Sequence, residues 1–281
     1  VLLGSFCIPL SSGVEIPIIA YILNSRPEVL SASLLDDRSA STSTIDPGVL
    51  FSFDVRCRDN NTAADILKVT AVIYSSKSSQ SAQDSAADHY TLRWSNPGGF
   101  SGFRIDSSGC GAPSDWTKAE GTWRFRARLG RDRRAGVWTL VVTVEDEAQS
   151  ASRSLSFTVN GFASLSLSSQ SLEVSGDPGT VASSSLQVSY ACNAPTSIGV
   201  RGTTFVGKQV SSFKLEPGDF MVDDDSSAGS PESGRPILIL SSSRQVFVDR
   251  LEGSGQIGLY IFVKIPDPFL DQDYEGNLIF D

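Results

Sequence analysis

The sequence contains few of the side chains that catalysis and metal binding use most. Its 281 residues include one histidine, one methionine and four cysteines. No two cysteines form a CxxC pair, and His89 alone cannot complete a Cys/His metal site at a known spacing. A Gly-x-Ser-x-Gly elbow is missing, so a hydrolase would depend on His89 beside a serine-rich loop. We therefore expect a protein that is not an enzyme and that needs no cofactor.

Basic residues are outnumbered. Lysine and arginine total 23 against 32 aspartates and glutamates, a formal net charge of -9. Such a balance argues against a nucleic-acid partner, because phosphates require a basic footprint. The local exception is an arginine-rich stretch over residues 124–134. Its first arginines alternate with apolar residues, which predicts the solvent face of a strand and its turn; contact with an acidic partner, including another copy, is the alternative.

No stretch is suited to cross a membrane as a helix. The most apolar segment, residues 1–23, is interrupted by Pro9, by Pro17 and by the turn at residues 11–13. It also lacks the initiating methionine and basic residues of an ordinary signal peptide, so we interpret the chain as mature, with its leader removed. Abundant serine and scarce lysine likewise favour an extracellular location at the cell surface.

Apolar and polar residues alternate in short runs bounded by Gly, Pro, Asp, Asn and Ser. Residues 49–55 show the pattern clearly, since Val49, Phe51, Phe53 and Val55 are separated by polar side chains. Only residues 63–67 could supply one helical turn. The sequence therefore predicts an all-β fold. Further strands are predicted at residues 67–74, 123–129, 138–144, 155–159, 165–167, 172–174, 186–190, 236–240, 246–248, 257–263 and 274–280.

Residues 135–160, AGVWTLVVTVEDEAQSASRSLSFTVN, resemble the last two strands of bacterial and archaeal immunoglobulin-like surface domains. Those domains close with a Gly-x-aromatic-Thr-Leu strand, a Val-x-Asp turn and a strand ending in Thr-Val. The resemblance implies a β-sandwich, although the Cys-Trp-Cys spacing of antibody domains is not reproduced. The matching residues are Gly136, Trp138, Thr139, Leu140, Val144, Asp146, Phe157, Thr158 and Val159.

The length favours two domains, and the pattern changes near Asn160-Gly161. We predict an extended N-terminal strand segment over residues 1–24, an immunoglobulin-like β-sandwich over 25–160 and a second β-sandwich over 161–281. The fold class is thus all-β with two tandem immunoglobulin-like sandwich domains.

The N-terminal segment fits neither sandwich pattern. Residues 14–23 are β-prone and would favour aggregation if left exposed, so something must cover them. They could pad their own sandwich, anchor at a membrane surface, or insert into a neighbouring subunit by donor-strand complementation. We adopt the third as the prediction. The predicted assembly residues are Val14, Ile16, Ile18, Ile19, Ala20, Tyr21, Ile22 and Leu23.

The four cysteines are compatible with two disulfides. Cys57 and Cys110 fall within the first predicted domain and form the better-supported pair. Cys7 with Cys192 would join the N-terminal segment to the second domain, in the same chain or a neighbour. Four reduced cysteines are the alternative.

Acidic loops and one glycosylation motif complete the candidate sites. Calcium binds several loop oxygens, but no acidic cluster here has EF-hand spacing, and solvated loops are the simpler interpretation. Asn60, in Asn60-Asn61-Thr62, is a candidate N-glycosylation acceptor. The acidic clusters are Asp223-Asp224-Asp225, then Asp267, Asp271, Asp273 and Glu275, and finally Glu145-Asp146-Glu147.

These features predict a structural subunit of an extracellular assembly, such as a pilus-like filament, sheath or surface layer, whose partners are other copies of the chain. The alternative is a carbohydrate- or cell-binding adhesion module with a glycan or cell-surface ligand. Trp94 and Trp116 are its candidate stacking residues, because Trp123 and Trp138 occupy alternating core positions.

Overall fold

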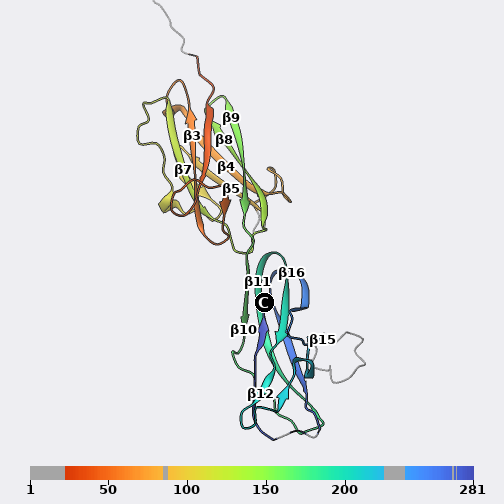
Figure 1. Cartoon of the computed structure of the whole chain (residues 1–281). Coiled ribbons are helices and arrows are strands. Elements are labelled where there is room, and N and C mark those ends of the chain that lie inside the picture. Colours follow the sequence, from red (N-terminus) through yellow and green to blue (C-terminus); the bar gives the residue numbers. More distant parts are fainter. Residues whose placement is uncertain (1–22, 85–87, 225–237, 268, 270) are drawn as a thin grey trace, which may run out of the picture.

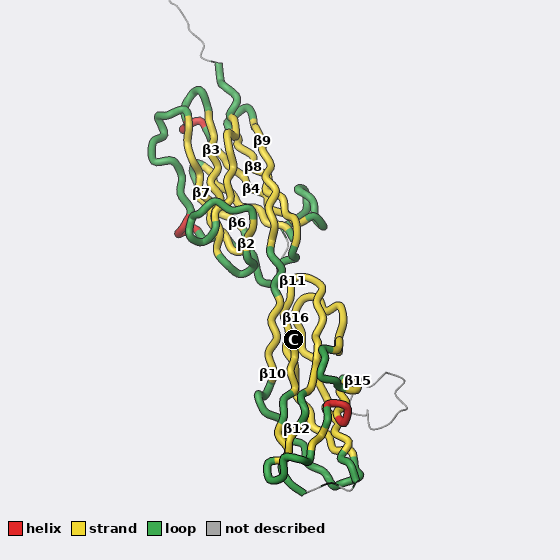
Figure 2. Tube along the Cα trace, in the orientation of Figure 1, coloured by secondary structure: helices red, strands yellow, loops and turns green. Residues whose placement is uncertain are grey.

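The computed structural model describes residues 23–84, 88–224, 238–267, 269 and 271–281. Figure 2 shows that strands and loops make up this part of the chain, which confirms the predicted all-β fold. Its helical residues lie in three short 3-10 turns, and no helix in the described ranges is long and apolar enough to cross a membrane. The turns are η1 (Ala63–Asp65), η2 (Ser107–Gly109) and η3 (Pro217–Asp219).

The first domain consists of two facing sheets (Figure 1). The smaller has the order β1-β3-β7 and is antiparallel, and the larger has the order β2-β9-β8-β4-β5-β6 with β2 parallel to β9. The strands of the smaller sheet are β1 (Glu28–Leu35), β3 (Leu50–Arg58) and β7 (Glu120–Arg128). Those of the larger are β2 (Thr44–Ile45), β4 (Lys68–Ser75), β5 (His89–Ser95), β6 (Gly99–Gly102), β8 (Gly136–Glu145) and β9 (Ser150–Val159).

Alternation along the strands builds the core between these sheets. Phe53 on β3 and Phe125 on β7 are buried and stack with ring centroids 5.1 Å apart. Trp138 and Leu140 of β8 are buried from the opposite sheet. Each large apolar side chain buried in this way stabilises the fold by about 1.5–3 kcal/mol. The connection over residues 129–135 therefore crosses from one sheet to the other.

The second domain has a larger sheet of order β10-β11-β16-β14-β15, with β18 also paired to β11, and a smaller sheet of order β13-β12-β17. Two strands that the sequence predicts at residues 246–248 and 257–263 are one continuous strand, β16. The strands are β10 (Ala163–Leu167), β11 (Val181–Gly202), β12 (Phe205–Gly207), β13 (Lys214–Leu215), β14 (Phe220–Asp223), β15 (Leu238–Ile239), β16 (Gln245–Lys264), β17 (Tyr274–Glu275) and β18 (Leu278–Phe280).

The long pair β11 and β16 bends at a bulge. Their regular register ends at Cys192 opposite Gly253 and resumes with Thr196 opposite Leu251. Gly253 has a φ of +77°, a value that glycine adopts at little cost. Figure 1 shows both strands arching over at the end that faces the first domain. The buried hydrophobic residues form one cluster within residues 29–159 and another within 188–263, on either side of this end.

Candidate functional site

The two domains meet at a polar junction built on Asn193, which follows Cys192 in the bulge of β11 and is buried. Its backbone N–H donates to the carbonyl of Phe162 at 3.1 Å, and its Oδ1 accepts from the Phe162 N–H at 2.6 Å. Its Nδ2 donates to the carbonyl of Asn160 at 2.9 Å, and its carbonyl accepts from the N–H of Ala135 at 2.9 Å. One buried side chain and its peptide groups thus join β11 to the linker and to the first domain.

The connection between β7 and β8 adds arginines to this junction. The Arg131 guanidinium lies over the ring of Phe162, 5.5 Å from its centroid. Arg133 is buried, lies over the ring of Tyr90 at 5.7 Å and contacts Asp132 at 3.4 Å. Such contacts contribute about 0.5–2 kcal/mol, more when the cation is desolvated. Arg131 and Arg133 of the predicted arginine-rich stretch are therefore engaged in packing at or near the junction.

A hollow of about 320 Å³ opens beside the junction. Both signs of charge line it, and Arg134 on its wall pairs with Asp88 at 3.8 Å. The thiol of Cys192 donates to the carbonyl of Leu251 at 3.3 Å, and burial raises its pKa. A thiol held neutral in this way is a poor nucleophile. The hollow is lined by Ser76, Lys77, Asp88, Asp132, Arg134, Ala135, Cys192, Asn193, Ala194, Pro195, Glu252 and Gly253.

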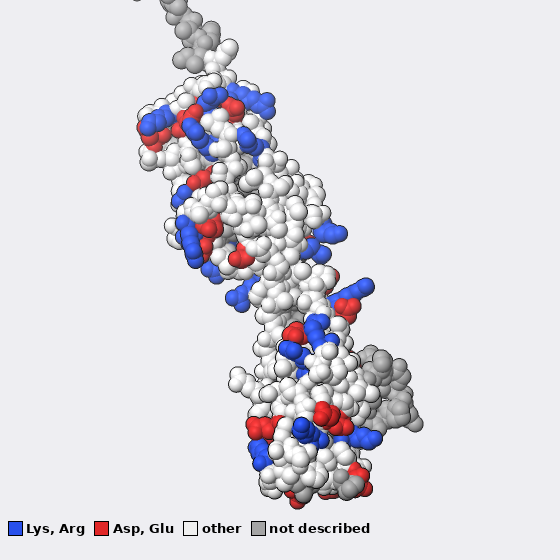
Figure 3. Space-filling view, in the orientation of Figure 1, with Lys and Arg blue, Asp and Glu red and all other residues white. Residues whose placement is uncertain are grey.

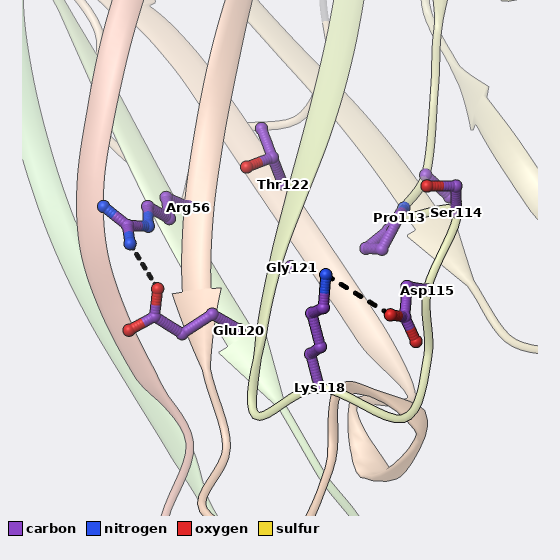
Figure 4. Close-up of a pocket in the computed structure, with 9 residues that line it drawn as sticks. Arg56, Pro113, Ser114, Asp115, Lys118, Glu120, Gly121 and Thr122 are labelled. Atoms are coloured by element: carbon purple, nitrogen blue, oxygen red, sulfur yellow. Dashed lines mark hydrogen bonds and ion pairs between the residues drawn. The ribbon is translucent and has the colours of Figure 1, made fainter.

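A second hollow, of about 480 Å³, lies beside β7 (Figure 4). Its charged groups are paired across it: Arg56 bonds Glu120, and Lys118 lies 3.4 Å from Asp115. With two cations matched to two carboxylates, the hollow presents no uncompensated charge to a ligand. It is a polar surface depression without a concentrated chemical function.

The predicted solvent face of β7 is present. Arg124 makes a two-pronged pair with Asp54 on β3, both contacts at 2.7 Å, and Arg126 lies 3.6 Å from Asp106. Figure 3 shows basic and acidic side chains next to one another on the side of the first domain that carries β3 and β7. The arginines there are matched by acids of the same chain, which leaves little net charge for an acidic partner.

His89 is buried at the start of β5. Its Nδ1 lies 3.0 Å from the Asp84 carboxylate and its Nε2 3.1 Å from the carbonyl of Gln80. Each ring nitrogen therefore has a polar partner in the segment that precedes β5. The ring thereby holds the preceding loop against β5, and neither nitrogen is directed at a serine hydroxyl.

The tryptophans do not form an open platform. Trp94 is 5% exposed and stacks on Trp116 with centroids 5.5 Å apart, and both contact Trp123 edge-on. Trp116 is half-buried against the core. Of the two roles open to Trp94, packing is the one present here, because its ring is buried, stacks on Trp116 and contacts Trp123.

The predicted disulfide between Cys57 and Cys110 is also wrong, because both are free thiols. Cys57 is opposite Gly121 on β7, whereas the Cys110 thiol accepts from the backbone N–H of Arg126. Those two β7 positions are separated by roughly 16 Å of strand, far beyond the reach of a disulfide. Burial raises the pKa of Cys57 to about 12. Cys192 is likewise a free thiol.

Other predicted sites are only partly within the described ranges. Cys7 and Asp225 lie outside them, as do all the predicted assembly residues except Leu23, which is 84% exposed. Asn60 is exposed and stays a candidate acceptor. Across the described ranges, no three acidic, histidine or cysteine side chains gather in a way that could hold a metal ion, and calcium stays the untested alternative to solvated acidic loops.

Acids of the predicted calcium clusters have local partners instead. Glu145 pairs with Lys68 at 2.9 Å, and Asp146 accepts from the N–H of Ala148 at 2.7 Å within its own turn. Lys208 lies 4.0 Å from Asp273 and 3.8 Å from Glu275.

Sequence reasoning missed Asn193, although Asn193-Ala194-Pro195 is a turn signal inside a β-prone run.

Neither a family model nor a curated protein matches the chain. One similar solved structure is the C-terminal domain of the Streptococcus pyogenes antigen I/II-family protein AspA, which is 9% identical in sequence. The match covers 91% of this chain and 98% of that chain, with a TM-score of 0.28. The Streptococcus agalactiae AgI/II polypeptide BspA C-terminal domain has 8% identity, 89% and 98% coverage and a TM-score of 0.28. At such TM-scores the likeness supports no inference about this chain.

Proposed function

We propose that this chain is a structural subunit of an extracellular filament, sheath or surface layer, and that it assembles by inserting residues 14–23 into a neighbouring subunit. The observation that carries the proposal is the position of Leu23, the described end of that segment. It is 84% exposed, while the first domain closes its core with strands from β1 onward. An apolar segment that its own domain does not need is available to a partner.

The exit of this segment is fixed at the pole opposite the second domain. Asn24 donates to Asp146 at 3.1 Å, Ser25 N–H to Asn61 at 2.8 Å, and Arg26 to the Ser150 carbonyl at 2.9 Å. Asn61 and Asp146 lie just beyond the ends of β3 and β8 and Ser150 begins β9, whereas the junction lies at the other end of β8. These contacts fix the start of the described chain at that pole, away from the junction.

The fold expected for such a subunit is an immunoglobulin-like sandwich in the first domain. In those domains strands A, B and E share one sheet, and strands C, F and G share the other with additions beside C. The order β1-β3-β7 fits A-B-E, and β9-β8-β4-β5 fits G-F-C-C′. This assignment supports the resemblance of residues 135–160, which contain β8 and β9, to immunoglobulin-like surface domains.

Load transmission is the role that best explains the junction. A subunit that carries tension needs consecutive domains joined by more than a flexible linker. The four hydrogen bonds of Asn193 and the Arg131–Phe162 contact supply that connection. A non-catalytic role is consistent with the occupied ring nitrogens of His89. The packed Trp94 gives adhesion to sugars no specific support.

The test compares the full chain with a chain that lacks residues 1–22, by analytical ultracentrifugation and negative-stain microscopy. The truncated chain is expected to fold as a monomer and to form no polymers. In the full chain, Ile18→Asp with Ile22→Asp should also prevent assembly, while the matched change Glu15→Gln should not. Polymers formed by the truncated chain would show that the segment is not the connector.

A further inference from the structure

β10 is an open edge of the larger sheet in the second domain. It pairs with β11 on one side and ends the strand order on the other, so no described strand covers its outer edge. Figure 1 shows it at the outer side of that domain. An unpaired strand edge is a template for another strand.

The register shows which peptide groups are free. Asn193 N–H donates to the carbonyl of Phe162, and Ser168 N–H donates to that of Gln187. Antiparallel pairing alternates, so the even-numbered residues from 162 to 168 bond to β11. The N–H and carbonyl groups of Ala163, Leu165 and Leu167 therefore point outward. Three consecutive outward residues can bond a docked strand over about 13 Å.

Apolar side chains extend to this edge and are left partly uncovered. Leu165 is opposite Tyr190, and Leu167 is opposite Val188, which is buried in the core of the domain. Opposite residues share a face, so both leucines continue the inner face of the sheet. Each is 37% exposed. A strand added beside β10 would cover them with its own inward-facing side chains.

The edge also lacks the charges that normally block strand addition. Residues 163–172, 181–200 and 253–263, which include β10 and the adjoining parts of β11 and β16, contain no lysine, arginine, aspartate or glutamate. By contrast, the β7 edge in the first domain is partly covered by bridges from Ile105 and Gly111. β10 thus combines an uncovered edge, apolar side chains and no charge over five residues.

The occupant must come from a second copy. Leu23, at the end of the predicted donor strand, lies at the far pole of the first domain, and β10 lies beyond the junction. The length of β8, ten residues, separates these positions, which is about 33 Å. Residues close to Leu23 therefore cannot reach β10 of their own chain. A subunit aligned head to tail presents its far pole to the second domain of the next one.

We propose that the outer edge of β10 is the acceptor for residues 14–23 of a neighbouring copy, which adds a strand to the larger sheet. This rests on the proposed function and names its acceptor. The contact is heterologous, since donor and acceptor are different surfaces, and repetition gives an open filament. Main-chain bonds to Ala163, Leu165 and Leu167 supply the affinity, and apolar side chains at alternate donor positions cover the two leucines.

The decisive pair of variants is Leu165→Pro and Leu165→Ala in the full chain. Both remove the side chain, but only proline removes the outward N–H, which β11 does not use. Leu165→Pro should keep the wild-type circular dichroism spectrum. Its critical concentration for assembly should be about tenfold above that of Leu165→Ala, because the proline variant loses one hydrogen bond to the donor strand. Equal critical concentrations for two folded variants would overturn the β10 acceptor.

Photo-crosslinking decides the case even if the proline variant fails to fold. p-Benzoylphenylalanine in place of Ser166 on β10 should crosslink to residues 14–23, and mixed isotope labelling should show that the product joins two chains. The same probe in place of Ser101, on the edge strand β6, should not. Crosslinks from position 166 to another β10 would overturn the proposal. If the chain lacking residues 1–22 polymerises, the proposed function itself fails; if only the β10 tests fail, the donor segment has a different acceptor.

Discussion

Asn193 and Phe162 exchange two hydrogen bonds across the start of the second domain, one through the backbone of Asn193 and one through its side-chain oxygen. The side-chain nitrogen of Asn193 is thereby aimed at the carbonyl of Asn160, the last residue of the predicted first domain. The linker is therefore held by a residue that lies more than thirty positions further along the chain. One side-chain amide thereby joins the linker to the bulge of β11.

Asn193→Asp should loosen the junction. The carboxylate still accepts from Phe162 N–H but faces the Asn160 carbonyl without a proton to donate. We expect the second domain to lose about 1–3 kcal/mol of stability and small-angle X-ray scattering to show a wider range of interdomain angles. Asn277→Asp, which adds the same charge at an exposed position of that domain, is the control. A scattering curve that is identical for both variants would contradict the inferred role.

Because Cys57 is buried, the stability of the folded chain is expected to change with pH in the alkaline range. Its pKa is raised from 9.0 to about 12 by burial, so the folded chain keeps the thiol proton where the unfolded chain has lost it. The free energy of unfolding that is linked to the protonated Cys57 thiol is present below pH 9 and is lost as the pH rises toward 12. Urea unfolding of Cys57→Ala should show a shallower loss of stability between pH 9 and 11 than wild type. Iodoacetamide at pH 8 should modify Cys110 before Cys57.

Asp59 has a pKa raised by burial as well, so its contribution to stability changes with pH in the same direction. Its pKa is raised first by burial and then by the charges of Asp65 and Asp146, against the hydrogen bond from Asn61 N–H. The stability linked to its protonated form is present at low pH and is lost as the pH rises through its folded pKa. Asp59→Asn keeps an acceptor for Asn61 and should be more stable than wild type at pH 7, with the difference shrinking toward pH 3. Asp37→Asn, at an exposed site, should change little.

Gly136 starts β8 with a φ of +112°, where an L side chain is strained. No atom lies within 4 Å of a Cβ added at Gly136 or at Gly161, and Gly161 lacks the positive φ. Gly136→Ala should therefore lower the free energy of unfolding by about 1–2 kcal/mol, measured by tryptophan fluorescence, while Gly161→Ala should be neutral or slightly stabilising. Equal effects would mean that φ is not what requires glycine at Gly136.

Strands with one buried face were predicted well because their signal is local. Residues 138–144 fall in β8, and residues 49–55 fall in β3 except Val49, which precedes the strand and is 40% exposed. The remaining alternate apolar side chains of both segments are buried. The second domain was harder. Serine and glycine separate the apolar residues of β11 and β16, so the sequence predicts short strands where two strands of 22 and 20 residues pair with each other. Mutual pairing, not periodicity, maintains that length.

The candidate sites also divide into those that a local pattern predicts and those that depend on residues distant in sequence. The solvent-facing arginines of β7 were predicted because a strand exposes every second residue. The Cys57–Cys110 pair was not excluded, since sequence separation says nothing about which β7 positions the two cysteines face. Asn193 was missed because its partners are distant in sequence, and its burial follows from the bend in β11.

By itself, the sequence determined the all-β class, the strands with alternating faces and the presence of an apolar N-terminal segment, because these depend on side-chain chemistry and a period of two residues. The tertiary structure decided which strands pair, that the cysteines stay apart, that Asn193 closes the junction and that β10 is left as an uncharged open edge. Those properties arise from register and sheet order. Both are set by contacts between distant residues, whose joint free energy no local pattern contains.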